Sequence, residues 1–221
     1  MDDYPESSLG SKIFPARAQS CAPFPVRPPP QTMMPPKALS LFALLLSTCL
    51  PFAASGQEMQ KGIQGQKAPP LNVSDWYQLP AGKEKIEITD YEGKIVVLLF
   101  FQHWCQASQE RELPVLQKLA KHYEGNDGIV FIAIQTAFEG FLDNTPDKLP
   151  VTAKKFELKI PMGHYTKVPA FPGVSGAYKP GGTPWWVIID RKGIVEYNGF
   201  ILNEEEAIKG FDKMLAGLPV D

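Results

Sequence analysis

Thiols and imidazoles are scarce in this chain of 221 residues, which contains three cysteines and three histidines. Cys21 and Cys49 lie in the N-terminal quarter, so Cys105 is the single thiol of the part with a globular composition. One thiol cannot form a disulfide within that part. So few sulfur and imidazole ligands also argue against a metal site. We therefore expect no internal disulfide and no metal, and no motif calls for another cofactor.

An excess of charge is absent as well. Lys and Arg number 22 against 24 for Asp and Glu, a formal net charge of −2. Nucleic-acid binding therefore has no electrostatic support. Hydrophobic residues make up 44% of the chain, enough for a packed core, and the length suggests one domain with appendages.

The N-terminal region lacks the apolar periodicity of a folded segment. Residues 1–36 are rich in Pro and Ser, which predicts a disordered extension. The alternative is that translation starts at Met33 or Met34.

An apolar stretch follows at residues 38–54, after Lys37 and before small residues suited to cleavage ahead of Gln57. This pattern predicts a secretory signal peptide over 37–56, and hence a periplasmic or otherwise extracytoplasmic protein. An uncleaved membrane anchor through 38–54 is the alternative, as is a lipid on Cys49, whose preceding residues resemble a poor lipobox. We expect a linker or entry segment at 57–82 and the folded domain at 83–221.

Cys105 has a distinctive local context. It follows the apolar run Ile95–Phe101, which predicts a strand buried on both faces, and it begins a helical pattern that extends to Tyr123. Free N–H groups and the macrodipole at a helix N-terminus favour a thiolate. The usual redox arrangement has a second cysteine three residues later, and here that residue is Ser108.

The remaining pattern predicts an α/β domain with a central mixed sheet flanked by helices. The strand, helix and strand around Cys105 imply a right-handed crossover and a parallel strand pair. Pro114 should kink the helix. The expected strands are Lys85–Thr89, Ile95–Phe101, Ile129–Ile134, Ile160–Tyr165, Trp185–Ile189 and Ile194–Tyr197. The further expected helices are Asp143–Leu158, Val174–Tyr178 and Glu204–Leu215, the last capped by Asn203.

In order and landmarks these elements resemble the thioredoxin fold. Trp104-Cys105-x-x-Ser108 takes the place of the Trp-Cys-x-x-Cys motif, and Gly182-Thr183-Pro184 resembles the cis-proline loop. Within the superfamily, residues 65–215 resemble the exported TlpA-like thiol–disulfide oxidoreductases, which grade into the redoxin (AhpC/TSA-like) proteins. Gly65–Pro69 resembles that branch's entry motif and Glu112–Leu116 its first-helix motif.

The chain departs from these families at three positions besides Ser108. Leu99 replaces the buried acid that some thioredoxins carry six residues before the first cysteine. A peroxiredoxin site needs Pro and then Thr or Ser where this chain has Leu98 and Gln102. The peroxidase interpretation is therefore weakened.

The resemblance makes Cys105 the candidate nucleophile. In a dithiol site the first cysteine attacks a disulfide and the second resolves the mixed disulfide. An exposed Cys105 can take the first step, but the Ser108 hydroxyl cannot take the second and can only donate a hydrogen bond to the thiolate. Isomerisation, monothiol exchange with a small thiol and peroxide reduction through a sulfenic acid remain open. So do a redox-degenerate binding module and a thiol that is merely a buried hydrophobe.

The resemblance also places Pro184 and Thr183 beside the cysteine, where the Thr183 backbone pairs with a bound peptide as an added strand does. Trp104 is expected to pack over the thiol and shape a binding patch, and His103 to point to solvent. Of Trp185 and Trp186, one ring should face inward and the other be exposed. The expected partners are protein thiols or disulfides, or small thiols.

Overall fold

A computed structural model describes residues 62–73, 75–137, 140–166 and 174–218. The predicted extension at 1–36, the predicted signal peptide or anchor, Cys21 and Cys49 lie outside the described residues. Within those ranges, no helix is both long and apolar enough to cross a membrane.

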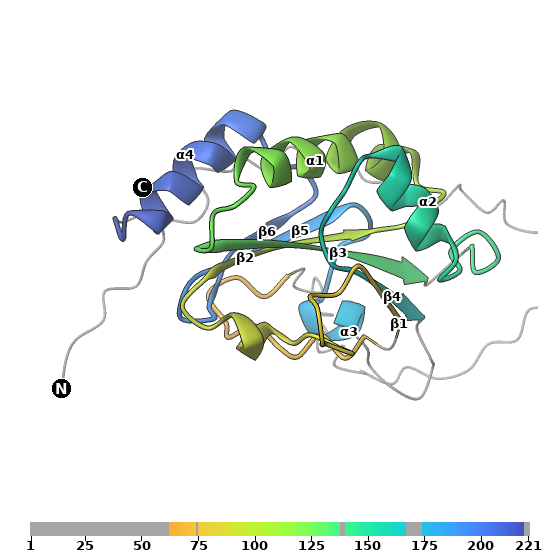
Figure 1. Ribbon diagram of the computed structural model, residues 1–221, viewed down its shortest axis with the longest axis horizontal. Helices are drawn as coiled ribbons and strands as arrows, with labels where there is room; N and C mark the ends of the chain where they lie inside the picture. Colours follow the sequence, from red (N-terminus) through yellow and green to blue (C-terminus); the bar gives the residue numbers. More distant parts are fainter. Residues whose placement is uncertain (1–61, 74, 138–139, 167–173, 219–221) are drawn as a thin grey trace, which may run out of the picture. The chain divides into compact units, whose positions relative to one another are not determined.

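A six-stranded mixed sheet forms the centre of the domain (Figure 1). The strand order is β1-β4-β3-β2-β5-β6, with β2 parallel to β3, β3 parallel to β4, and the other neighbours antiparallel. The strands are β1 (Asp75–Tyr77), β2 (Ile95–Phe101), β3 (Ile129–Ala137), β4 (Met162–Thr166), β5 (Trp185–Ile189) and β6 (Val195–Gly199). The predicted parallel pair and the mixed α/β class are confirmed.

Strand β2 explains why the sheet is covered on both faces. All seven of its residues are buried, and alternate side chains enter two separate hydrophobic clusters. Val97, Leu99 and Phe101 pack with the cluster under α1 and α4, whereas Val96, Leu98 and Phe100 pack on the opposite face. A continuous apolar run is the pattern of such a doubly covered strand.

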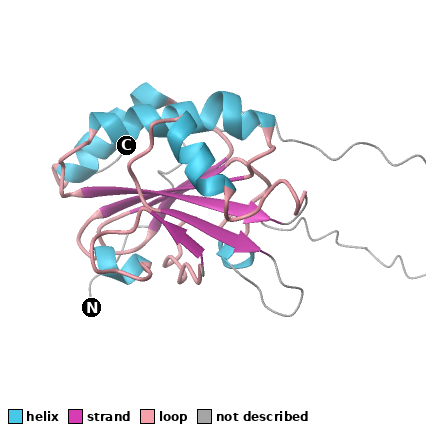
Figure 2. Ribbon diagram, turned by 45° about the vertical axis from the view of Figure 1, so that its right-hand side comes forward, coloured by secondary structure: helices cyan, strands magenta, loops and turns pink. Residues whose placement is uncertain are grey.

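The three longer α-helices lie on one face of the sheet, and the shortest α-helix lies on the other (Figure 2). The first face carries α1 (Leu113–His122), α2 (Lys148–Lys155) and α4 (Glu204–Leu215), and the second carries α3 (Val174–Tyr178). Helix α4 begins as predicted, because Asn203 accepts a hydrogen bond from Glu206 N at 3.1 Å. Helix α2 is shorter than the predicted 143–158.

The predicted strand at Lys85–Thr89 is wrong. A 3-10 helix, η1 (Ile88–Tyr91), lies there instead. Glu87 and Asp90 form a capping box, in which Glu87 N donates to Asp90 Oδ2 at 2.8 Å. Local side-chain caps therefore override the alternating pattern.

Strand β1 was not predicted; it lies inside the predicted entry segment and pairs with β4. The expectation of one exposed tryptophan is wrong too, since Trp185 and Trp186 are exposed by only 4% and 0%. Both rings are buried because β5 is an inner strand with cover on each face.

Candidate active site

Cys105 occupies the junction between β2 and the following helix. A tight turn connects them, in which Cys105 N donates to Gln102 O at 3.1 Å. The helix starts directly after the cysteine, since Gln109 N donates to Cys105 O at 3.0 Å. The predicted strand–turn–helix context is therefore present.

The thiol faces the loop that precedes β5. Cys105 Sγ donates to the carbonyl oxygen of Thr183 at 3.5 Å, and the Thr183–Pro184 peptide bond is cis. Sheet topology brings these parts together, because β2 ends beside the start of β5, with Phe100 opposite Trp185. The side chain of Cys105 is fully buried, with 0% exposure. A reaction of this thiol with a protein therefore requires a local rearrangement.

Ser108 lies at the beginning of a π-helical turn, η2 (Ser108–Glu112), which continues into α1. Leu113 N donates to Ser108 O, a bond over five residues instead of four. The turn comes just before Pro114, which has no N–H to donate, so the predicted kink takes the form of a π-helical turn. Ser108 is buried at 0% exposure, and its Oγ has no hydrogen-bond partner within the described structure.

Glu112 supplies a buried carboxylate on the α1 side of the sheet. Its Oε2 accepts from Trp186 Nε1 at 2.7 Å, and its Oε1 accepts from Arg111 Nε at 2.8 Å. Sequence reasoning treated Glu112 only as part of a helix motif and looked for a buried acid at Leu99. The signal available was a charged residue at an inward position of the first helix.

Three polar side chains and one backbone N–H group form a hydrogen-bonded network around the cysteine turn. Gln102 donates from Nε2 to Thr183 Oγ1 at 3.1 Å, and Asn144 donates from Nδ2 to Gln102 Oε1 at 3.2 Å. Asn144 Oδ1 in turn accepts from His103 N at 2.6 Å. Sequence reasoning missed Asn144 because it is 39 positions from Cys105 in a segment without a motif.

His103 does not point freely to solvent, contrary to expectation. Its ring is half-buried, and Nδ1 lies 3.0 Å from Thr152 Oγ1 in α2. Burial, together with the positive charges of Lys148 and Lys155, lowers the pKa of His103. The ring is thus placed to connect the cysteine turn to α2.

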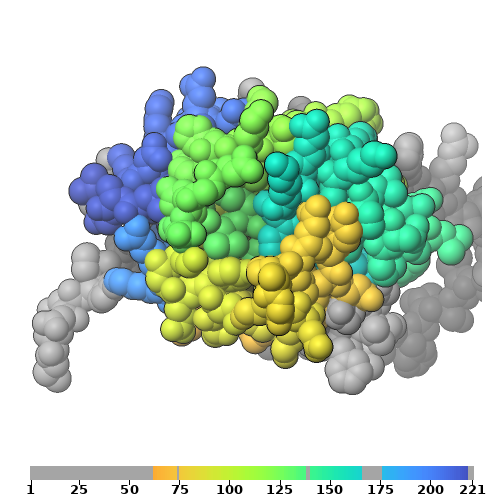
Figure 3. Space-filling view, in the orientation of Figure 1, coloured from red at the N-terminus to blue at the C-terminus, as the bar shows by residue number. Residues whose placement is uncertain are grey.

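Helix α2 lies beside the beginning of the first helix. Lys155 Nζ donates to Gln109 Oε1 at 2.8 Å, and Figure 3 shows this part of the chain (teal) next to α1 (green). Trp104 is 41% exposed, and its indole is packed so closely on Gly140 that a Cβ there would lie 2.5 Å from Nε1. The exposed side chains of Phe141 and Leu142 follow directly.

His164 lies away from the thiol. It is buried on β4, where Gln135 Nε2 lies 2.9 Å from its Nδ1, and burial lowers its pKa. In the described ranges no cluster of three His, Cys, Asp or Glu could hold a metal ion.

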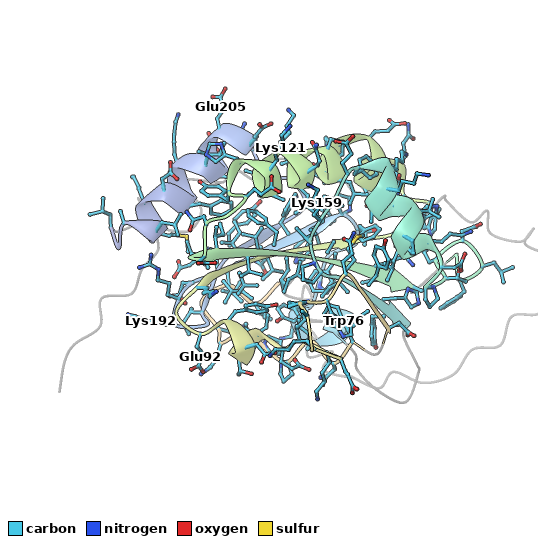
Figure 4. The ribbon with its side chains drawn as sticks, in the orientation of Figure 1. Trp76, Glu92, Lys121, Lys159, Lys192 and Glu205 are labelled. Atoms are coloured by element: carbon cyan, nitrogen blue, oxygen red, sulfur yellow. The ribbon has the colours of Figure 1, made fainter. Side chains whose placement is uncertain are left out.

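Two hollows in the described part of the structure lie away from the thiol. One of about 420 Å³ is lined by Lys121 and Lys159, among others, and one of about 310 Å³ by Glu92 and Lys192 (Figure 4). Neither is lined by Cys105 or Thr183.

The sheet order and the thiol opposite a cis-proline loop define the class of protein as thioredoxin-like. Solved structures agree. A thiol-disulfide isomerase from Corynebacterium glutamicum is 25% identical, with a TM-score of 0.58, over 67% of this chain and 97% of that one. The thioredoxin-like superfamily protein SPOA0173 has a TM-score of 0.60 at 24% identity, over 70% and 99% of the two chains.

Residues 64–198 match the model of the AhpC/TSA family, and the chain belongs to this family. It is also similar to the thiol-disulfide oxidoreductase ResA of Bacillus cereus, with 29% identity over 72% of this chain and 81% of that protein. The thioredoxin-like protein YneN of Bacillus subtilis is 26% identical over 61% and 71% of the two chains. The thioredoxin-like and redoxin resemblance drawn from the sequence is thus confirmed.

Proposed function

We propose that the protein is an exported thiol–disulfide oxidoreductase that acts through the single nucleophile Cys105. One observation carries the proposal: the thiol lies at a helix start and against the Thr183 carbonyl beside cis-Pro184, with a serine at the position of the second cysteine. Similarity to ResA and to a bacterial thiol-disulfide isomerase supports the same chemistry.

The first step is attack of the Cys105 thiolate on one sulfur of a substrate disulfide. A new S–S bond joins Cys105 to that sulfur, and the other substrate sulfur leaves as a thiolate that takes up a proton. Ser108 cannot displace the substrate, because an alkoxide is not formed at neutral pH and an oxygen cannot resolve a disulfide. Instead, its unpartnered hydroxyl is available to donate to the buried sulfur when that is ionised.

The folded domain contains no second thiol, so a thiol from outside the domain must complete the cycle. When the substrate's own second thiol attacks the mixed disulfide, the substrate is isomerised and Cys105 is regenerated without net oxidation. When a small thiol attacks, the substrate leaves reduced and the small thiol is left in a disulfide with Cys105, which a second small thiol then reduces. Thr183, whose carbonyl already faces Cys105, is the proposed backbone contact for an extended peptide.

Isomerase activity tests the proposal directly. We expect the full chain to reactivate scrambled ribonuclease A in a glutathione buffer, and Cys105→Ala to lose this activity. A Cys21→Ser/Cys49→Ser double variant should retain it, which assigns the chemistry to the domain thiol. If neither the parent protein nor Cys105→Ala reactivates ribonuclease A, but both still capture peptides, the protein is a binding module instead. Peroxide consumption with trapping of a sulfenic acid at Cys105 would identify a peroxidase.

Export is the second part of the proposal. It rests on the charged residue, apolar stretch and small residues over 37–56. N-terminal sequencing of the protein recovered from its native host should give a chain that starts at Gln57. A chain that retains residues 37–56 in the membrane fraction would favour the anchor.

A further inference from the structure

Asn144 uses both ends of its side-chain amide to hold the turn before Cys105. The residue is 1% exposed. Its Oδ1 accepts from the backbone N–H of His103 at 2.6 Å, and its Nδ2 donates to Gln102 Oε1 at 3.2 Å. A side-chain amide carries both an acceptor and a donor, and here it uses them on two adjacent residues.

Gln102 carries the connection onward to the loop that faces the thiol. Its side chain is 1% exposed and donates to Thr183 Oγ1 at 3.1 Å. The carbonyl oxygen of the same threonine accepts from Cys105 Sγ. The hydrogen bonds thus run from Asn144 through Gln102 and Thr183 to the sulfur.

The backbone around Asn144 contacts the third residue of the turn as well. Asn144 N donates to Gly140 O at 3.1 Å, and the indole of Trp104 packs against Gly140. The segment 140–144 therefore contacts residues 102, 103 and 104, and the next residue is the fully buried Cys105. This segment lies between β3 and α2, outside the sheet, so its contacts with the turn can open and close without disturbing the sheet.

We propose that Asn144 is a positioning residue that keeps the Cys105 thiol sheltered, so that opening of its contacts with Gln102 and His103 governs access to the sulfur. The inference rests on the proposed function in that it takes Cys105 as the reacting thiol. It differs from that function in being measurable without a substrate.

The test is the rate of alkylation of Cys105 by iodoacetamide, followed in the full chain by mass spectrometry of the Cys105 peptide. Rates are measured from about pH 6 to pH 10, which brackets the ordinary cysteine pKa of about 8.5. A plateau at high pH reports access alone, because the rate there no longer depends on ionisation of the thiol. We expect Asn144→Ala to raise this plateau by about tenfold or more, as local opening becomes easier.

Asn198→Ala is the matched control. Asn198 Oδ1 also accepts a backbone N–H, from Ile63 at 2.7 Å, but on β6, which is separated from β2 by β5. Its plateau should stay within about twofold of the parent protein's. Asn144→Asp keeps the acceptor for His103 N and loses the donor, so its plateau should lie between those of the parent and Asn144→Ala.

If Asn144→Ala shows no cooperative thermal transition, Gln102→Met provides a second variant. Methionine is similar in length to glutamine but makes neither of the hydrogen bonds of the Gln102 amide. A plateau within about twofold of the parent's in a folded Asn144→Ala or Gln102→Met protein would overturn the proposal. An equal rise in Asn198→Ala would also overturn it. If the plateau rises in Asn144→Ala but the parent protein has no isomerase activity, only the proposed function is refuted. If the parent protein is an active isomerase but the plateau is unchanged in Asn144→Ala, only the proposed role of Asn144 is refuted.

Discussion

At the scale of single residues, the serine at position 108 decides which half of the redox cycle the chain can perform. The site keeps a helix start, a carbonyl contact to the sulfur and a cis-proline loop. Ser108 is fully buried one turn after Cys105. A single oxygen in place of sulfur therefore separates this site from a two-thiol site.

Ser108→Cys should restore the missing half. Because the substitution is close to isosteric and the residue lies one helical turn after Cys105, we expect the introduced thiol to form a disulfide with Cys105 under mild oxidation. The variant should then release trapped substrate without an added thiol. Peptide mass spectrometry of the oxidised, non-reduced protein measures the bond.

Gln106→Cys is the control for that variant, because residue 106 is exposed and adjacent to Cys105 in sequence. It should gain a reactive thiol without the internal disulfide. If Ser108→Cys also keeps two separately alkylated thiols after oxidation, the π-helical turn directs residue 108 away from the sulfur and the equivalence with the second cysteine is wrong.

At the scale of elements, much of the architecture could be predicted because apolar runs and caps are local signals. The run Ile95–Phe101 and the Asn203 cap each determine an element on their own. The strand predicted at Lys85–Thr89 failed because a capping box there competes with the alternating pattern. Asn144 and Thr152 could not be predicted as neighbours of the cysteine turn, because only the path of the chain after β3 brings them to it.

Gly140→Ala tests the contact between that segment and the cysteine turn. Gly140 has φ +58°, and a Cβ would lie 2.5 Å from Trp104 Nε1, so the substitution should displace the indole as well as strain the backbone. We expect greater quenching of tryptophan fluorescence by acrylamide and a lower thermal midpoint.

Gly82→Ala separates the two effects. Gly82 has φ +77° with nothing within 4 Å of the added Cβ, so it carries the backbone cost without the collision. Its quenching should match that of the parent protein. Equal quenching in Gly140→Ala and Gly82→Ala would show that Trp104 is not held by residue 140.

At the scale of the whole molecule, the doubly covered sheet buries several titratable rings. His103 and His164 have pKa values lowered mainly by burial. Burial raises the pKa of Tyr197 to about 12 and also raises the pKa values of Tyr91 and Tyr178. Each shift favours the neutral ring in the folded state. The free energy of unfolding should therefore be largest at the pH values at which the unfolded chain also keeps these rings neutral.

The sign of the pH dependence follows from proton binding. Below about pH 6.5 the unfolded state binds protons at its histidines more readily than the folded state, so the free energy of unfolding should fall as the pH falls. Above about pH 10 the unfolded state loses tyrosine protons that the folded state retains, so the free energy should fall as the pH rises. Urea unfolding across this range should therefore give a plateau between the two limits.

His164→Phe assigns the acid limb, because His164 is the more deeply buried of the two rings. The free energy of unfolding of the variant should fall less between about pH 6.5 and pH 5, because one of the two histidines whose pKa is lowered by folding is removed. Its alkaline limb should remain as in the parent protein, because the tyrosines are unchanged. An acid limb as steep as the parent's would show that His164 titrates alike in the folded and unfolded states, and that the fall at low pH comes from other groups.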